Sequence, residues 1–353
     1  MTSHHKTILD THHASRITHH VTRIGLIGFG YWGPNLARNF HALPGADLSA
    51  ICDANPDRLQ KARSLYRATT FYDDLEKLLA SDVEAVAIAT PARTHYALAR
   101  AALEAGKHVF VEKPLAMTVP EATELVGIAD RSGLVLMVGH VFEYVPAVRH
   151  IKTLLDQGTI GETYYLYSTR VNLGRIQTDI NALWSIAPHD ISIALYLFGQ
   201  MPESVSARGA RYLNGTVEDV IFLTLNFPDG VLAHVHASWL DPSKMRRMTI
   251  VGSEKMIIYD DLSAEGKVEV YDKGAVRATD PQYGEYQYRL HSGDIAIPKL
   301  PLLEPLRVEC EDFIAAIQTG SAPLADGRDG LRVVQVLAAA QQSLEQDGRL
   351  VSI

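Results

Sequence analysis

The stretch RIGLIGFGYWGPNLARNF, residues 23–40, decides the fold. Residues 24–27 form a short apolar run typical of a buried strand, and residues 34–40 have helical periodicity with a proline in the first turn. The Gly-x-Gly-x-x-Gly pattern between them leaves the N–H groups of the helix start free for a pyrophosphate. A structural glycine turn is the alternative, but we predict that a dinucleotide contacts Gly28, Phe29, Gly30, Tyr31, Trp32 and Gly33.

An acidic residue stands where the second expected strand, residues 48–52, ends. Asp53 follows Gly33 by twenty residues, a spacing at which a carboxylate accepts hydrogen bonds from the adenosine ribose and repels a 2′-phosphate. No Arg or Ser comes directly after Asp53, and Arg58 is five positions further on. The pattern therefore predicts NAD rather than NADP as the cofactor.

Short apolar strands alternate with helical segments over residues 22–144. Further buried strands are expected at residues 85–89, 108–111 and 135–138, and further helices at residues 56–66, 72–79, 94–104 and 120–131. This alternation calls for a parallel sheet that is covered on both faces. We therefore predict an NAD-binding α/β Rossmann domain, with a doubly wound parallel sheet, for residues 22–144.

The pattern changes over residues 145–353, which we predict to form a substrate-binding and oligomerisation domain of the α+β class. Long alternating strands flank tight turns at residues 228–230 and 252–255, so an antiparallel sheet is expected. Helices are expected at residues 306–317 and 331–344, packing back on the core.

Composition excludes several classes of protein. With 353 residues, 47% of them hydrophobic, and a net charge of −8, the chain suits two domains and gives no sign of a nucleic-acid partner. Cys52 and Cys310 both lie in apolar surroundings and read as core residues rather than as a disulfide framework. No apolar stretch is long enough to cross a bilayer. We expect a cytoplasmic protein.

The first twenty residues hold six of the fifteen histidines. This tract lacks the basic and apolar regions of a signal peptide and has no apolar period. Metal binding by the histidines is an alternative, but no cysteine or carboxylate cluster accompanies them. We predict a flexible extension over residues 1–21 and no metal site.

Two segments at the carboxyl ends of expected strands carry candidate chemistry. Thr90 and Pro91, with His95, follow the strand at residues 85–89, and Glu112 and Lys113 follow the strand at residues 108–111. Ligands bind at this edge of an open parallel sheet, so we predict cofactor contacts for all five residues. Lys113 would reach the nicotinamide, although a solvated surface lysine is the alternative.

Together the glycine loop, Asp53, the segment from Ala89 to His95, and Glu112-Lys113-Pro114 resemble the Gfo/Idh/MocA oxidoreductases. The resemblance covers nearly the whole chain from Arg23. It implies that a Rossmann domain precedes a domain with a large, open, mainly antiparallel sheet, that Lys113 is catalytic, and that the chain forms a homodimer or homotetramer. Residues 172–175 and 183–190 look most like members that act at C3 of nucleotide-linked sugars, such as UDP-N-acetylglucosamine 3-dehydrogenases and ketoreductases.

Oxidation of a secondary alcohol needs a group that accepts the hydroxyl proton, and Lys113 and His189 are the candidates. His189 lies in the first turn of an expected helix, where the positive end of the helix dipole favours neutral imidazole. Related proteins commonly have an aspartate four residues before this histidine, where this chain has Ser185. Either Lys113 and His189 suffice, with Asp179 or Asp190 assisting, or the chain binds NAD without catalysis.

Substrate contacts are predicted for a further group of residues. Two guanidinium groups in or near the strand at residues 163–171 would hold a diphosphate or a carboxylate, although solvated arginines are equally common. The tyrosines at 164, 165 and 167 read as sheet packing rather than as a sugar platform. The predicted substrate set is Arg170, Asn172, Arg175, Trp184, Ser185 and His189.

The sequence thus predicts an NAD(H)-dependent oxidoreductase that transfers a hydride between nicotinamide and a secondary alcohol or ketone of a sugar. C3 of a nucleotide-linked sugar is the favoured position. A free-polyol dehydrogenase of the inositol type, and an NAD(H)-binding sensor or partner subunit without turnover, are the alternatives.

Overall fold

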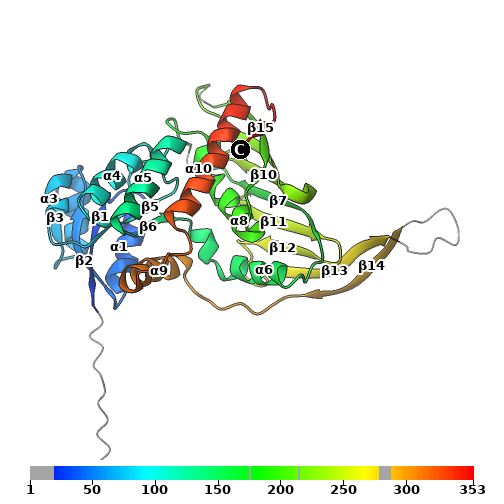
Figure 1. The fold of residues 1–353 in the computed structure, drawn as a ribbon, viewed down its shortest axis with the longest axis horizontal. Coiled ribbons are helices and arrows are strands. Elements are labelled where there is room, and N and C mark those ends of the chain that lie inside the picture. The colour runs from blue at the N-terminus through cyan, green and yellow to red at the C-terminus, as the bar shows by residue number, and fades with distance from the viewer. Residues whose placement is uncertain (1–19, 175, 214, 278–287) are drawn as a thin grey trace, which may run out of the picture.

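The computed structural model describes residues 20–174, 176–213, 215–277 and 288–353 (Figure 1). Nearly all of the histidine-rich tract lies outside these residues, as does Arg175. Two sheets lie side by side, and helices cover both faces of the first sheet and one face of the second. Within the described residues, no helix is long and apolar enough to span a membrane.

The first sheet is entirely parallel. It consists of β1 (Thr22–Ile27), β2 (Ala46–Cys52), β3 (Thr70–Tyr72), β4 (Ala85–Ile88), β5 (His108–Glu112) and β6 (Leu136–Gly139). Their spatial order is β3-β2-β1-β4-β5-β6, so the order reverses between β1 and β4. A reversal of this kind opens a crevice at the carboxyl ends of the strands, where ligands bind. The predicted Rossmann sheet is confirmed.

Helices cover both faces of this sheet because its strands are apolar on both sides. The helices are α1 (Gly33–Ala42), α2 (Pro56–Leu65), α3 (Leu75–Leu79), α4 (His95–Glu104) and α5 (Val119–Ser132), with a 3₁₀ turn η1 (Ala92–Thr94) before α4. Val109 packs with α4 and α5, whereas its neighbour Phe110 packs with α1 on the other face. This alternation buries every central strand.

One predicted helix, residues 72–79, is wrong at its amino-terminal end. Residues Thr70–Tyr72 form the edge strand β3, and the helix begins only at Leu75. Asp74 adopts an extended backbone, and its side chain accepts a hydrogen bond from the N–H of Glu76. An aspartate in this position caps a helix, so the helix cannot extend toward Tyr72.

The second sheet has nine strands. They are β7 (Thr163–Val171), β8 (Ser204–Ala210), β9 (Val220–Asn226), β10 (Leu232–Ser238), β11 (Met245–Gly252), β12 (Met256–Asp260), β13 (Val268–Arg277), β14 (Tyr288–Ala296) and β15 (Val351–Ser352). Their order is β14-β13-β12-β11-β7-β10-β9-β8-β15, and only the β7–β10 pair is parallel. The large, mainly antiparallel sheet implied by the family resemblance is confirmed.

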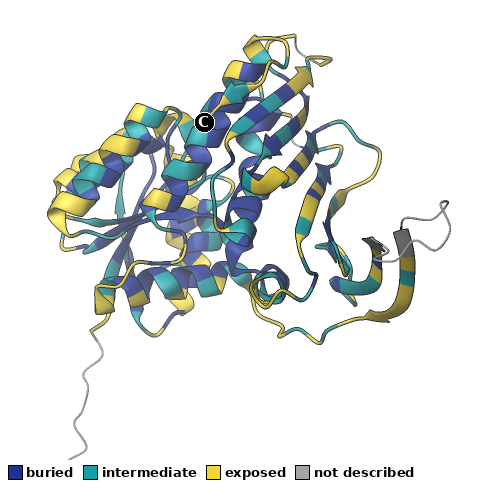
Figure 2. Ribbon diagram, turned by 45° about the vertical axis from the view of Figure 1, so that its right-hand side comes forward, coloured by how far each residue is buried: buried dark blue, intermediate teal, exposed yellow. Residues whose placement is uncertain are grey.

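Among the residues that the structure describes, helices cover one face of the second sheet and leave the other face open. Helices α6 (Pro146–Asp156), α7 (Ala182–Ser185) and α8 (Pro188–Phe198) lie against it. Burial alternates along the strands, as Figure 2 shows by colour. In β7, Leu166 is fully buried, whereas Tyr165 and Tyr167 are exposed on the uncovered face.

Two C-terminal helices complete the structure, α9 (Pro305–Thr319) and α10 (Gly327–Glu345). Helix α9 packs against the first sheet, where the ring of Phe313 contacts Phe40 and Phe110 edge to face. Helix α10 lies between the two sheets and contacts α5, β6, α8 and β8. A domain boundary between residues 144 and 145 stays a prediction, because both helices cross back toward the first sheet.

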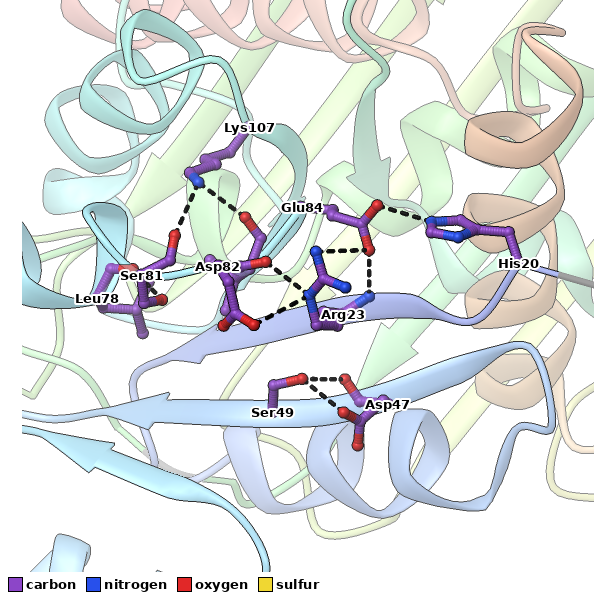
Figure 3. A network of polar contacts seen from close by, with 10 residues as sticks. His20, Arg23, Asp47, Ser49, Leu78, Ser81, Asp82, Glu84 and Lys107 are labelled. Atoms are coloured by element: carbon purple, nitrogen blue, oxygen red, sulfur yellow. Dashed lines mark hydrogen bonds and ion pairs between the residues drawn. The ribbon is translucent and has the colours of Figure 1, made fainter.

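Polar contacts tie the amino end of β1 to the loop before β4 (Figure 3). Arg23 donates its backbone N–H to Glu84 and a guanidinium N–H to the carbonyl of Asp82, and His20 contacts Glu84 at 2.7 Å. These groups are partly exposed, so each ion pair contributes at most about 1 kcal/mol. The network lies at the edge of the sheet opposite the carboxyl ends of the strands, so it takes no part in the crevice.

Candidate active site

Two adjoining cavities lie at the carboxyl edge of the first sheet, with volumes of about 660 and 580 Å³. The larger one is lined by the glycine loop and the end of β2, and the other by the ends of β5 and β6 and by β7 and α8. Tyr31, Trp32, Thr90 and Pro91 line both cavities, so the two cavities adjoin at these residues. The arrangement suits one ligand that extends from the glycine loop toward Lys113.

The glycine loop has the geometry that close approach to a ligand requires. Gly28 has a φ of +94°, and a Cβ there would lie 2.8 Å from Cγ2 of Thr90. A Cβ on Gly33 would lie 2.0 Å from the carbonyl oxygen of Gly28, so only glycine lets α1 start so close to β1. Gly30 faces the larger cavity, and the nearest atom to a Cβ there is 3.7 Å away, on Arg58.

Asp53 closes the far end of the larger cavity. Its Oδ2 accepts a hydrogen bond of 2.7 Å from the N–H of Phe29, and its Oδ1 accepts one of 2.8 Å from the N–H of Asn55. These bonds fix the carboxylate, and each oxygen keeps a lone pair for a ribose hydroxyl. Nη1 of Arg58 lies 3.6 Å from Oδ2 of Asp53. Within the described part of the chain, Arg58 is the one arginine that lines this cavity, and the carboxylate of Asp53 offsets its positive charge. The residues present fit an adenosine ribose without a 2′-phosphate.

Two residues of the predicted loop contacts line neither cavity. The side chain of Phe29 is buried in the core, edge to face with Tyr66, so only its backbone reaches Asp53. Gly33 is buried under the start of α1. In the structure these residues shape the loop, whereas Gly28, Gly30, Tyr31 and Trp32 line the larger cavity.

Lys113 lies at the end of β5 and lines the second cavity. Its Nζ donates a hydrogen bond of 2.8 Å to the backbone carbonyl of Ser185, at the end of α7. Burial lowers the pKa of this ammonium to about 8, against the opposing charge of Glu112 and with help from Arg170. The amine therefore reaches its neutral, proton-accepting form near physiological pH.

Glu112 lies beside Lys113 and beneath Gly139, where an added Cβ would be 3.0 Å from its Oε2. Burial raises the pKa of this carboxyl, although the neighbouring ammonium of Lys113 opposes the effect. The carboxyl of Glu112 and the amine of Lys113 therefore lie together in a poorly solvated part of the cavity, where each one stabilises the charged form of the other.

His189 lines the same cavity from the first turn of α8. Its Nδ1 is buried without a hydrogen-bond partner, and its ring lies edge to face on Phe142 with centroids 5.0 Å apart. Burial, with the positive charges of Lys113 and Arg170, lowers the pKa of this imidazole well below its usual value. As the sequence predicts from the helix start, the ring is neutral and can accept a proton or a hydrogen bond.

Arg170 lines the cavity, but its guanidinium is engaged. Nε donates to Oδ2 of Asp190 at 2.6 Å, and the group lies 4.2 Å from the ring centroid of Phe142. Asp190 also accepts a hydrogen bond from the hydroxyl of Ser168. Asp190 therefore sits in the first turn of α8 as the partner of Arg170.

The imidazole of His95 lies between two loops and contacts the backbone of both. Its Nδ1 lies 2.8 Å from the carbonyl oxygen of Pro114 and its Nε2 lies 2.9 Å from that of Thr90. Burial lowers the pKa of this ring, so one nitrogen donates and the other faces a carbonyl. The side chain ties the Thr90–Pro91 loop to the lysine segment.

Five of the six predicted substrate residues line the second cavity, namely Arg170, Asn172, Trp184, Ser185 and His189. Ser185 accepts a hydrogen bond from Gln177 at its hydroxyl, Trp184 donates its indole N–H to Gln341 of α10, and Asn172 folds over Gly174. With Arg170 they surround the position of Lys113 and His189. Arg175 lies outside the described residues, so its predicted contact has no structural account.

Sequence reasoning missed the residues that β11 and its preceding loop bring to this cavity, Trp239, Lys244 and Arg246, and it missed Phe142. Arg246 forms an ion pair with Asp261 at 3.1 Å, whereas Lys244 is exposed and lies near the start of the strand. The pairing of β11 with β7, which lies 74 or more residues earlier in the chain, places Arg246 beside Arg170. A local pattern has no signal for such a contact.

Comparison with known proteins gives matches over nearly the whole chain. Residues 22–140 match the oxidoreductase family with an NAD-binding Rossmann fold, and residues 148–258 match the Gfo/Idh/MocA C-terminal domain. The UDP-N-acetylglucosamine 3-dehydrogenase of Acidithiobacillus ferrooxidans is 31% identical over 322 residues, which cover 91% of this chain and 95% of that protein. Its solved structure has a TM-score of 0.77 at 29% identity and covers 92% of this chain and 98% of that one. The myo-inositol 2-dehydrogenase of Thermotoga maritima is 25% identical over 341 residues, covering 92% and 96% of the two chains.

The chain combines a Rossmann sheet, whose carboxyl edge forms a crevice suited to NAD, with a large, mainly antiparallel sheet. The second sheet closes the cavity around a lysine and a histidine. Together these features define an NAD-dependent dehydrogenase. The chain belongs to the Gfo/Idh/MocA family of oxidoreductases. The family resemblance and the choice of NAD, both predicted from the sequence, are confirmed.

Proposed function

We propose that this dehydrogenase transfers a hydride between NAD and C3 of a nucleotide-linked sugar such as a UDP-N-acetylglucosamine derivative. One observation carries the proposal, the convergence of Lys113 and His189 on a cavity that adjoins the glycine loop. The likeness to a UDP-N-acetylglucosamine 3-dehydrogenase over 91% of the chain supports the choice of substrate.

In the mechanism that we propose, NAD supplies the hydride acceptor, and the chain supplies the proton acceptor. Neutral Lys113 takes the proton of the reacting hydroxyl, while its hydrogen bond to the carbonyl of Ser185 holds Nζ in place. Neutral His189 accepts a hydrogen bond from the same or a neighbouring hydroxyl and orients the sugar. In ketone reduction, protonated Lys113 returns the proton.

Excess positive charge at the far end of the cavity supports an anionic substrate. The guanidinium of Arg170 is matched by Asp190. Asp261 is shared between Arg246 and Lys267, and Lys244 adds a further exposed ammonium. A diphosphate bound there would meet at least one unmatched cation.

The experiment follows absorbance at 340 nm while purified protein and NAD⁺ meet UDP- and TDP-linked sugars, the corresponding free sugars and inositols. Turnover with a nucleotide-linked sugar, lowered at least about 100-fold by Lys113→Ala and by His189→Ala, is the expected result. Lys152→Ala is the matched control, because Lys152 pairs with Asp156 on the surface of α6. Turnover of free inositols alone would overturn the substrate assignment.

A second candidate, an NAD(H)-binding sensor without turnover, is favoured by Ser185. Its hydroxyl is bound by Gln177 and carries no negative charge, so the cavity lacks the aspartate that is common at this position in relatives. Tight NADH binding without turnover of any sugar in the panel would favour this candidate.

We also propose a homo-oligomer that forms through the uncovered face of the second sheet. Phe222, Tyr165, Tyr167 and Leu232 are each more than 40% exposed there, and Phe222 stacks on His236 with centroids 4.5 Å apart. A broad, aromatic-rich sheet face is typical of a protein interface.

Finally, we propose a cytoplasmic location, as the composition predicts. Both cysteines are free and buried, which suits a reducing compartment. Cell fractionation with an antibody to the chain tests this, and recovery with secreted proteins would contradict it.

A further inference from the structure

A buried polar cluster lies under the floor of the active site and has no role in the reaction derived above. It consists of His140, directly after β6, Glu143, in the 3₁₀ turn η2 (Val141–Tyr144), and Asp329, in the first turn of α10. The side chains of His140, Glu143 and Asp329 are 1%, 1% and 3% exposed. Three ionisable groups without water need a specific arrangement of protons or an ion.

The distances favour a shared proton. Nδ1 of His140 lies 2.6 Å from Oδ2 of Asp329 and 3.4 Å from Oε1 of Glu143. Two ligands of a tetrahedral zinc ion, each about 2.0–2.1 Å from it, lie roughly 3.3 Å apart, so Nδ1 and Oδ2 are too close to bind one ion together. Arg332 anchors the other side, because its Nη2 donates to Oδ1 of Asp329 at 2.7 Å.

The cluster holds a positive charge on His140. Burial alone would lower the pKa of this imidazole, but the hydrogen bond to Asp329 and the nearby carboxyl of Glu143 raise it to about 9. Burial raises the pKa of the Glu143 carboxyl to about 8, whereas the contact with His140 lowers that of Asp329 in spite of burial. At neutral pH the group therefore consists of an imidazolium, a carboxylate and a protonated glutamic acid.

The same 3₁₀ turn faces the active site on its other side. Val141 and Phe142 line the catalytic cavity, while His140 and Glu143, on either side of them, take part in the cluster. Phe142 contacts the ring of His189 and the guanidinium of Arg170. Helix α10 is thus connected, through Asp329 and η2, to His189, the histidine proposed to orient the sugar.

We propose that the cluster of His140, Glu143 and Asp329 is a positioning element for His189. It fixes η2 so that Phe142 packs on the His189 ring, and its imidazolium disfavours a second buried positive charge on that ring. This inference rests on the proposed role of His189 in the reaction.

The charged groups around both histidines agree with this role. His189 is influenced by the cations Lys113, Arg170, His140 and Arg246, and its neighbour Asp190 is already paired with Arg170. His140 is surrounded by Asp329, Glu143 and Glu112, and Arg332 lies behind Asp329. Removal of the charge at residue 140 therefore removes one of four cations that act on His189.

The test is an NMR titration of the histidine ring signals of the full chain, which needs no substrate. The signal of His189 is assigned by its loss in His189→Gln. In His140→Gln, whose amide still donates to Asp329, we expect the midpoint of His189 to rise by about half a pH unit or more. Arg328→Gln is the matched control, because Arg328 lies in the same turn of α10 but pairs with Asp130 on the surface. An unchanged midpoint in a folded His140→Gln protein would overturn the proposal.

Two measurements on the wild-type protein keep the proposal testable even when His140→Gln does not fold. The wild-type ring signal of His140, assigned through its bonds to the backbone of residue 140, should titrate near pH 9, and a midpoint near 6.5 would overturn the inference. Elemental analysis should find no stoichiometric metal, and one zinc per chain that disappears with His140 would likewise overturn it. A shifted His189 midpoint in a protein without turnover would leave this inference standing and reject the proposed function instead.

Discussion

Single residues in this active site differ from surface residues mainly through burial. Lys113 loses hydration at the end of β5, and its amine becomes a base near neutral pH. His189 stays neutral for the same physical reason. Asp53, in contrast, keeps its carboxylate bound to two backbone N–H groups, which suits recognition rather than proton transfer.

The lowered pKa of Lys113 predicts the pH dependence of turnover. Oxidation of the alcohol needs the neutral amine, so kcat/KM for oxidation should rise tenfold per pH unit below about 8 and level off above it. Reduction of the ketone needs the ammonium, so its kcat/KM should fall above about 8. Initial rates from pH 6 to 10 check both limbs. Parallel profiles in the two directions would contradict a proton-transfer role for Lys113.

A substitution of Asp53 should change the cofactor preference. Asp53→Asn keeps an acceptor for the N–H of Phe29 but removes the charge that repels a 2′-phosphate and holds Arg58 at 3.6 Å. We expect NADH to bind about tenfold more weakly and NADPH to bind more tightly, as measured by quenching of protein fluorescence. Asp57→Asn is the control, because Asp57 is an exposed aspartate in the first turn of α2, next to Arg58. An unchanged ratio of the two affinities would show that Asp53 does not select the cofactor.

At the scale of elements, the close approach of α10 to β6 depends on a glycine. A Cβ on Gly330 would lie 2.4 Å from Cγ2 of Val138 and 3.1 Å from a side-chain carbon of Leu115, both in the buried core. Gly330→Ala should therefore lower the free energy of unfolding by about 1–3 kcal/mol. Thermal melting followed by circular dichroism measures the change.

Gly127→Ala is the paired substitution, in the middle of α5. There the nearest atom to a new Cβ is 3.1 Å away, at the end of the flexible side chain of Arg131. Alanine should raise stability by about 0.5–1 kcal/mol, because glycine is a poor helix former. Equal effects of the two substitutions would contradict the packing argument.

The boundaries of helices and strands were predictable from the sequence where a single residue, such as a proline or a glycine, determines them. Helix α8 begins at Pro188 and ends before Gly199, which places His189 in its first turn as predicted, and β7 spans the predicted residues 163–171. The strand β3 was missed because its three residues have no alternation to detect, and the cap at Asp74 was taken for helix interior. The predicted end of α10 at residue 344 lies next to the observed end at Glu345, whereas the helix starts at Gly327, four residues before the predicted start, because Asp326 caps it there.

At the scale of the whole molecule, the proposed assembly through the second sheet is testable. Phe222→Asp would place a charge in the middle of the uncovered aromatic face, where Phe222 stacks on His236. We expect a smaller mass by light scattering after size exclusion and unchanged secondary structure by circular dichroism. Tyr212→Asp is the control, since Tyr212 is 73% exposed outside the strands. A wild-type protein that elutes as a monomer would reject this interface.

The sequence predicted the residues that line the cavities from the first sheet more completely than those from the second. Gly28, Gly30 and Asp53 follow from local spacing, because one strand, turn and helix place them. Arg246 and Phe142 follow only from the pairing of β11 with β7 and from the turn η2 under the cavity. Contacts between elements far apart in the chain can be identified only from the tertiary structure. The ion pair of Arg170 with Asp190 is another contact that the sequence pattern does not reveal.

The position of α9 has a consequence for how the protein is made. Phe313 fills the core against Phe40 and Phe110, so the NAD-binding sheet uses a residue that leaves the ribosome about 170 positions after its last strand. Until then that face of the sheet lacks part of its cover, and the nascent chain carries an apolar surface that chaperones can recognise. The core on this face of the NAD-binding sheet is therefore completed only after most of the polypeptide has emerged.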